Sequence, residues 1–100
     1  MTVHELKTRP EFFNAVENGD KPFEVRRCDD RSFAVGDVLI LREYDPGAET
    51  YTGRECAREV TYVLVGPPFL PDGLAVMGLK TSIETYYVVR DRIGCRATTP

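Results

Sequence analysis

Apolar and polar residues alternate along several short stretches of the chain, which is typical of half-buried β-strands. A further stretch, TYYVVR at 85–90, has the same strong strand propensity. The sequence therefore predicts five or six strands in all. The first five strand segments are 3–7 (VHELK), 22–27 (PFEVRR), 38–44 (VLILREY), 54–65 (RECAREVTYVLV) and 74–80 (LAVMGLK).

Helical spacing is found over residues 10–18, where Phe12, Phe13 and Val16 form an apolar stripe. We expect this stripe to belong to the core and not to a stacking surface. Gly19 follows where a left-handed residue usually ends a helix. The sequence therefore predicts one short helix before the second strand.

The remaining segments are loops. Asp45-Pro46-Gly47 opens a hairpin loop that we expect to run to about Gly53. GPPFLPDG, at 66–73, is a rigid loop rich in proline. This number of strands in about 100 residues usually closes into a small barrel or packs as a sandwich. We therefore expect a mainly β (α+β) fold, with the helix flanking one end.

The composition, 42% hydrophobic and 29% charged, is that of a folded globular protein. The net charge of −3 argues against broad, non-specific binding to duplex DNA, although a local basic cleft is compatible with it. No apolar run approaches the roughly 20 residues of a membrane helix, and the first residues lack a signal-peptide core. We therefore expect a cytoplasmic protein without a membrane partner.

The cysteines, Cys28, Cys56 and Cys95, are odd in number, widely spaced and without a close pair. His4 is the single histidine. This spacing argues against a disulfide framework and against a zinc site, since zinc ligands usually come in close pairs. The sequence predicts free thiols, no metal and no cofactor.

The stretch NGDKPFEVRRCDD, at 18–30, gathers charged residues around one strand. In that strand Phe23 and Val25 share one face, and Glu24 and Arg26 share the other. One interpretation is a solvated charged face, which is the usual role of such a surface. The other is a ligand site at a barrel mouth. There Lys21 and Arg26 would hold a phosphate or carbonyl, and Glu24 would accept hydrogen bonds or act as a base.

The pattern Gly19-x-Lys21-x-x-Glu24-x-Arg26 resembles the signature of ASCH domains, which belong to the PUA-like superfamily. Neighbouring motifs resemble a small ASCH-related group of bacteria and phages with unknown function. They are HELK at 4–7, PEFF at 10–13, FEVR at 23–26, DRSFAVGD at 30–37, LILREYDP at 39–46, YTGRE at 51–55 and VMGLK at 76–80.

The resemblance covers about residues 3–80 and implies a PUA-like β-barrel over residues 1–80 with a cleft proposed to bind RNA. It implies that Lys21, Glu24 and Arg26 line this cleft. In the closer group His4, Lys7 and the Asp30-Arg31 pair recur, which adds them as lining residues. The loop from Arg27 to Asp29 is about one residue longer than the pattern, which leaves its placement open.

Residues 81–100 have no counterpart in the resemblance. We expect an added edge strand here, followed by a frayed tail from Gly94. An unpaired strand would be an exposed edge, so a homodimer formed through this segment is a further hypothesis.

Three functions remain open. The first is an RNA- or nucleotide-binding module, with a base stacked on an aromatic side chain. The second is a small hydrolase acting on RNA or on an acylated, cytidine-type nucleoside, with Lys21 and Glu24 as the catalytic pair. ASCH relatives that remove an acyl group from cytidine carry a threonine where Glu24 stands here. The third is a phage or bacterial protein-interaction module. The candidates for the stacking residue are Tyr44, Tyr51, Tyr62 and Phe69.

Overall fold

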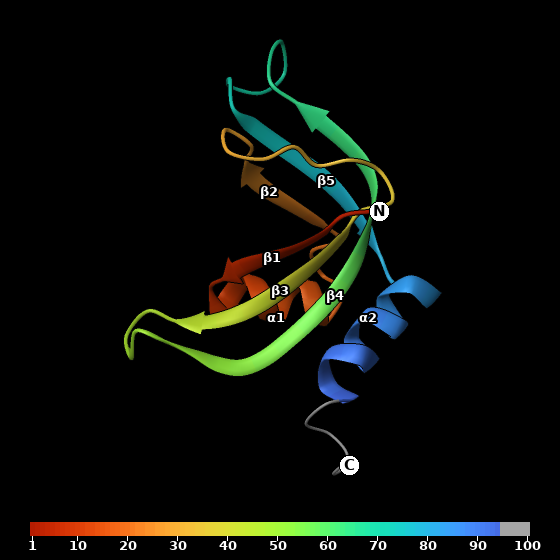
Figure 1. The fold of residues 1–100 in the computed structure, drawn as a ribbon. Coiled ribbons are helices and arrows are strands. Elements are labelled where there is room, and N and C mark those ends of the chain that lie inside the picture. The colour runs from red at the N-terminus through yellow and green to blue at the C-terminus, as the bar shows by residue number, and fades with distance from the viewer. Residues whose placement is uncertain (95–100) are drawn as a thin grey trace.

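The computed structural model describes residues 1–94, with side chains described as far as residue 88. Five strands form one sheet in the order β1-β3-β4-β5-β2, and this sheet curls into a half-barrel (Figure 1). The expected mainly β fold of five or six strands is confirmed, with five strands present in the described residues. The elements in chain order are β1 (Val3–Thr8), α1 (Pro10–Glu17), β2 (Phe23–Arg27), β3 (Val38–Asp45), β4 (Thr50–Val65), β5 (Leu74–Lys80) and α2 (Ile83–Gly94).

The long strand β4 produces the curl. Its first part pairs with β3 and its last part pairs with β5, both antiparallel. A register shift between Val60 and Tyr62 lies close to the changeover, where a bulge bends the strand. β1 pairs in parallel with β3, and β2 pairs antiparallel with β5. β1 and β2 are therefore the two edges of the sheet, and we call the gap between them the seam.

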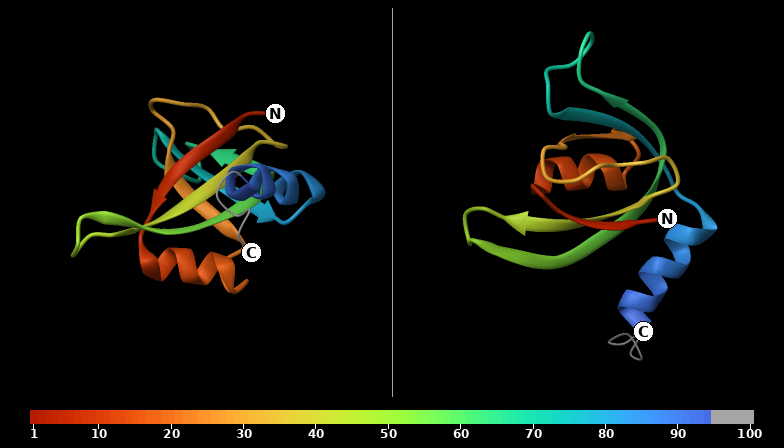
Figure 2. Two further views of the ribbon diagram at one scale, coloured as in Figure 1. Left: turned by 60° about the horizontal axis from the view of Figure 1, so that its bottom comes forward. Right: turned by 45° about the horizontal axis from the view of Figure 1, so that its top comes forward.

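The hydrophobic core lies on the concave face of the sheet. Leu6, Leu39 and Met77 are buried there together with Phe13 and Val16 of α1. The two helices lie on different faces, with α1 inside the curve and α2 outside it (Figure 2, right view). On the convex face, Val88 of α2 packs against a smaller buried cluster of Val38, Ile40 and Ala57.

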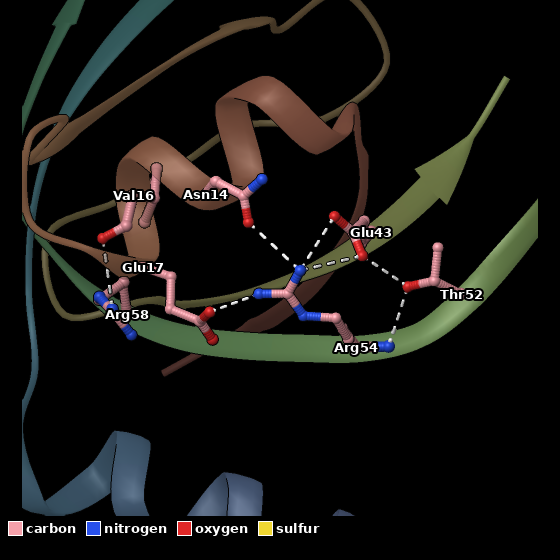
Figure 3. A network of polar contacts seen from close by, with 7 residues as sticks. All are labelled: Asn14, Val16, Glu17, Glu43, Thr52, Arg54 and Arg58. Carbon is pink, nitrogen blue, oxygen red and sulfur yellow. Dashed lines mark hydrogen bonds and ion pairs between the residues drawn. The ribbon is translucent and has the colours of Figure 1, made fainter.

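Arg54 fixes α1 to the sheet. Its guanidinium donates to Glu17 at 2.6 Å and to Asn14 at 3.2 Å, both on α1 (Figure 3). It also donates to the buried Glu43 of β3 at 3.4 Å and lies 4.8 Å from the centroid of the Phe13 ring. Because this side chain of β4 contacts both the helix and β3, the position of α1 follows that of the β3–β4 pair.

The segment 85–90, predicted to be a strand, is helical, so that prediction is wrong. Ser82 and Thr85 exchange hydrogen bonds between the main-chain N–H of each and the side-chain oxygen of the other, at 2.8 and 3.2 Å. This reciprocal cap, with Glu84 in the first turn, starts α2 and overrides the strand propensity of the tyrosines and valines. The strand that suggested a homodimer is thus a helix. The homodimer itself stays a prediction, and residues 95–100 of the expected frayed tail lie outside the described residues.

The β3–β4 hairpin loop is also shorter than predicted. Asp45 already pairs with Thr50, so the loop occupies only 46–49 and not the span to Gly53. The Asp45 carboxylate accepts hydrogen bonds from the main-chain N–H of Gly47 at 2.9 Å and of Ala48 at 3.3 Å. These contacts close a tight Asx-type turn, so Tyr51 and its neighbours belong to β4 and not to the loop.

Candidate functional site

Strand β2 turns its charged face inward. Glu24 is only 2% exposed, whereas Phe23 and Val25 are 41% and 43% exposed. The interpretation of the charged face as solvated surface is therefore wrong for Glu24. β2 is an edge strand, and its inward face borders the seam, where polar partners are at hand. A buried charge is tolerated when such partners satisfy it.

Two cations satisfy the Glu24 carboxylate. Its Oε1 accepts a hydrogen bond from Lys21 Nζ at 2.7 Å, and its Oε2 accepts one from Arg26 Nε at 2.7 Å. The side chains of Lys21 and Arg26 are 18% and 22% exposed to solvent. Gly19, with a φ of +90°, ends the turn after α1 and lets the chain reverse into β2. Glu24 thus anchors both cations with their outer parts in contact with solvent.

Arg26 connects the two edges of the sheet. Its Nη1 donates to the main-chain oxygen of Lys7 at 2.9 Å, and its Nη2 donates to the Thr8 hydroxyl at 3.0 Å. Both acceptors belong to β1, on the far side of the seam. Arg26 therefore joins strands that share no ladder in this sheet and fixes the local width of the seam.

A cleft of about 640 Å³ lies along the seam. Six basic and two acidic side chains take part in its lining, although the whole chain carries a net charge of −3. Such clustering focuses a positive potential in one concave place. The lining residues are Leu6, Lys7, Thr8, Arg9, Phe12, Lys21, Glu24, Val25, Arg26, Arg27, Asp30, Arg31 and Phe33.

Most of the site residues predicted from the sequence lie in this cleft. Lys21, Glu24, Arg26, Lys7 and Arg31 all line it, from both edge strands and from the segments just before and after β2. The structure thus brings together residues as far apart in the chain as positions 7 and 31.

His4 does not line the cleft. It is buried behind it, with Nε2 2.9 Å from Asp37 Oδ2 and its ring 4.7 Å from that of Phe33. Phe33 is itself a lining residue. His4 therefore supports the wall of the cleft from inside and is not placed to touch a ligand there.

Asp37 holds the end of the long β2–β3 loop. Its carboxylate accepts main-chain hydrogen bonds from Thr2 at 3.0 Å and Ala34 at 2.9 Å, besides the contact with His4. Burial acts to raise the pKa of this carboxyl, but the hydrogen bonds from His4, Thr2 and Ala34 together outweigh it, and the pKa lies below its usual range. The ionised carboxylate ties β1 to the loop that carries Arg31.

The loop after Arg26 is held by contacts at the surface. Arg27 Nε donates to Asp29 Oδ2 at 2.7 Å, and the main-chain N–H of Cys28 donates to the oxygen of Gly73 at 2.8 Å. A Cβ at Gly73 would collide with Asp29, and its φ of +75° also favours glycine. The β4–β5 loop and the loop after β2 therefore support each other at this end of the seam.

Phe12 was missed as a site residue. It is 47% exposed and lines the cleft, so its expected place in the core is wrong. Adjacent helical residues point about 100° apart, and α1 buries Phe13 together with Val16. Phe12 then turns away from the core. The aromatic residues proposed for stacking from the sequence, Tyr44, Tyr51, Tyr62 and Phe69, are absent from the cleft lining of the described chain.

A metal-binding cluster and a membrane-spanning helix are both absent from the part of the chain that the structure describes. It contains no group of three or more His, Cys, Asp or Glu residues arranged to hold a metal ion. Its helices are also too short or too polar to cross a membrane.

The chain belongs to the family described as "Domain of unknown function (DUF3850)", which matches residues 3–79. It is also similar to the "Uncharacterized 12.9 kDa protein in GpA 3'region" of Escherichia phage P2. The two are 38% identical over 61 residues, which are 61% of this chain and 53% of the phage protein. The chain thus spans about half the length of the curated relative that it matches. The family match includes both edge strands and every residue that lines the cleft.

Proposed function

We propose that this protein is an RNA- or nucleotide-binding module of the ASCH, PUA-like type, which binds an anionic ligand in the cleft of the seam. The main support is the concentration of basic side chains in one concavity of an acidic chain. A binding site for nucleic acid needs such a basic footprint. The likeness of residues 19–26 to the ASCH signature supports the same proposal.

Donor groups in the cleft remain available for a ligand. Lys21 has three N–H donors and gives one to Glu24, within the described residues. Arg26 has five N–H donors and gives one each to Glu24, Lys7 and Thr8. The remaining N–H groups of Lys21 and Arg26 suit a phosphate or the carbonyl of a base, since charged donors form the stronger hydrogen bonds to anions.

Glu24 acts in this proposal as a positioning residue. Both of its oxygens accept short, charge-assisted hydrogen bonds, and the side chain is almost completely buried. A general base must reach the proton that it removes. Glu24 could do so only after releasing Lys21 or Arg26, so the geometry favours binding over the hydrolase alternative.

The proposal is tested by fluorescence anisotropy with a labelled single-stranded 12-nucleotide RNA at 50 and 200 mM salt. We expect the affinity of the wild type to fall steeply with salt, because each phosphate neutralised by the protein releases counterions. Arg31→Ala and Lys7→Ala should weaken binding and reduce the salt slope by about one each. The matched control is Lys80→Ala, since Lys80 is an exposed lysine paired with Glu59 at 3.8 Å and does not line the cleft.

The outcomes separate the functions. Undetectable RNA binding, or equal losses in Arg31→Ala and Lys80→Ala, would overturn the proposal. The RNA is examined on a denaturing gel after each titration. Cleavage that disappears in Lys21→Ala would move the assignment to the hydrolase.

A further inference from the structure

At one end of the cleft the Lys21 ammonium lies close to two phenylalanine rings. Its Nζ is 5.2 Å from the ring centroid of Phe12 and 5.4 Å from that of Phe23. Phe12 comes from α1, and Phe23 is the first residue of β2. Two elements on either side of the turn at Gly19 thus place aromatic rings around the same cation.

Neither ring belongs to the core. Both keep more than two-fifths of their surface exposed, while the neighbouring Phe13 is completely buried. Exposed phenylalanine side chains lose the free energy that burial would provide. The rings are also not the main partners of the ammonium, because Lys21 is already paired with Glu24 at 2.7 Å. Packing alone therefore does not account for this placement.

The position of the Phe12 ring matches the needs of an unpaired nucleobase. A base in single-stranded RNA exposes its flat faces, which stack on aromatic side chains, while its phosphate binds cations. Here Phe12 lines the cleft next to Lys21, so a stacked base and a bound phosphate can be adjacent. Bases inside a duplex are covered by their neighbours and offer no such face.

We infer that Phe12 is the base-stacking surface of the cleft, and that its ligand class is single-stranded nucleic acid with an unpaired base. This inference rests on the proposed function and deepens it. It distinguishes the cleft from a site for a bare polyanion, for which charge alone would suffice. It also replaces the four aromatic residues proposed from the sequence, because none of them lines the cleft.

The test uses Phe12→Leu, which keeps an apolar side chain suited to a helix and removes the π face. Two labelled probes of equal length and charge are titrated: an eight-nucleotide oligoadenylate and an abasic ribose-phosphate oligomer. We expect Phe12→Leu to weaken binding of the oligoadenylate about tenfold, within the range that stacking provides, and to leave the abasic probe unchanged. Phe12→Tyr retains an aromatic ring and should preserve the affinity.

Phe69→Leu is the matched control. Phe69 is 78% exposed on the β4–β5 loop and does not line the cleft, so its replacement should change neither titration. Equal losses for both probes in Phe12→Leu, or no loss for either, would overturn the inference. Failure of Phe12→Tyr to preserve binding would overturn it as well, which covers the case of a Phe12→Leu variant that folds poorly.

The two proposals fail differently. If the wild type binds neither probe, the proposed function itself fails. If it binds both probes with equal affinity and the same salt dependence, the cleft binds anions, and only the stacking inference fails.

Discussion

Replacement of Glu24 tests whether the cleft is organised around its buried carboxylate. In Glu24→Ala, Lys21 and Arg26 lose the acceptor that each contacts at 2.7 Å. Breaking a buried ion pair by removing one partner lowers the free energy of unfolding by ~3–5 kcal/mol. The side chains of Lys21 and Arg26 are 18% and 22% exposed, so water can hydrate part of each charge. We therefore expect a loss at the lower end of that range, about 3 kcal/mol.

The assay is urea unfolding followed by far-UV circular dichroism. For a domain of this size the m-value is about 1–1.5 kcal/mol per molar urea, so the midpoint of Glu24→Ala should fall by about 2–3 M. Lys80→Ala breaks an exposed ion pair, with N···O at 3.8 Å, and should change the free energy of unfolding by less than about 0.5 kcal/mol. A Glu24→Ala midpoint no lower than that of Lys80→Ala would refute the reasoning.

A triple variant separates stability from function. Lys21→Met, Glu24→Leu and Arg26→Met together replace all three charges by apolar side chains of similar length. Such replacements of buried ion networks are often neutral or stabilising. We expect this variant to unfold at a higher urea concentration than Glu24→Ala and yet to lose RNA binding. Recovery of binding with recovered stability would show that the charges serve folding alone.

Three further predictions concern the surroundings of the cleft. Arg54→Ala should lower the free energy of unfolding by about 1–2 kcal/mol in urea titrations, since it removes the ion pairs with Glu17 of α1 and Glu43 of β3 but the lost side chain is half exposed. Asp37→Asn should be less stable than the wild type at pH 7. That difference should shrink as the pH falls below about 4, because a carboxyl with a lowered pKa stabilises the fold only while it is ionised; an unchanged difference down to pH 2 would contradict the assignment. Burial raises the pKa of the Cys56 thiol to about 11, so iodoacetamide at pH 8 should alkylate Cys28 before Cys56, as read by peptide mass spectrometry.

The strand order of the cleft's walls could not be predicted from the sequence, although most of the site residues that were predicted do line the cleft. Lys21, Glu24 and Arg26 are local in the chain, so the signature marks them directly. Which face of β2 points inward depends on β2 being an edge strand, and that is a property of the whole sheet. Alternation along a strand separates two faces but does not say which one is buried.

The errors at Phe12 and at residues 85–90 have local causes. Phe12 and Phe13 are adjacent in a helix, so burying one turns the other away, and this geometry could have predicted the exposed ring. The reciprocal contact between Ser82 and Thr85 is a helix start that the sequence displays as S-x-x-T. The tyrosines and valines that follow favour a strand by their propensity. The cap geometry nevertheless decides whether this short helix forms.

The seam also brings main-chain groups to the cleft. β1 and β2 are edge strands, and the side of an edge strand that faces away from its neighbour carries N–H and C=O groups without ladder partners. One of them, the oxygen of Lys7, already accepts a hydrogen bond from Arg26. Such groups have the donor and acceptor spacing to read the edge of a base, and no side-chain substitution can remove them. Under the proposed function we therefore expect alanine scanning of this cleft to leave a residual, base-dependent affinity, and backbone amide shifts in β1 and β2 are the direct way to observe it.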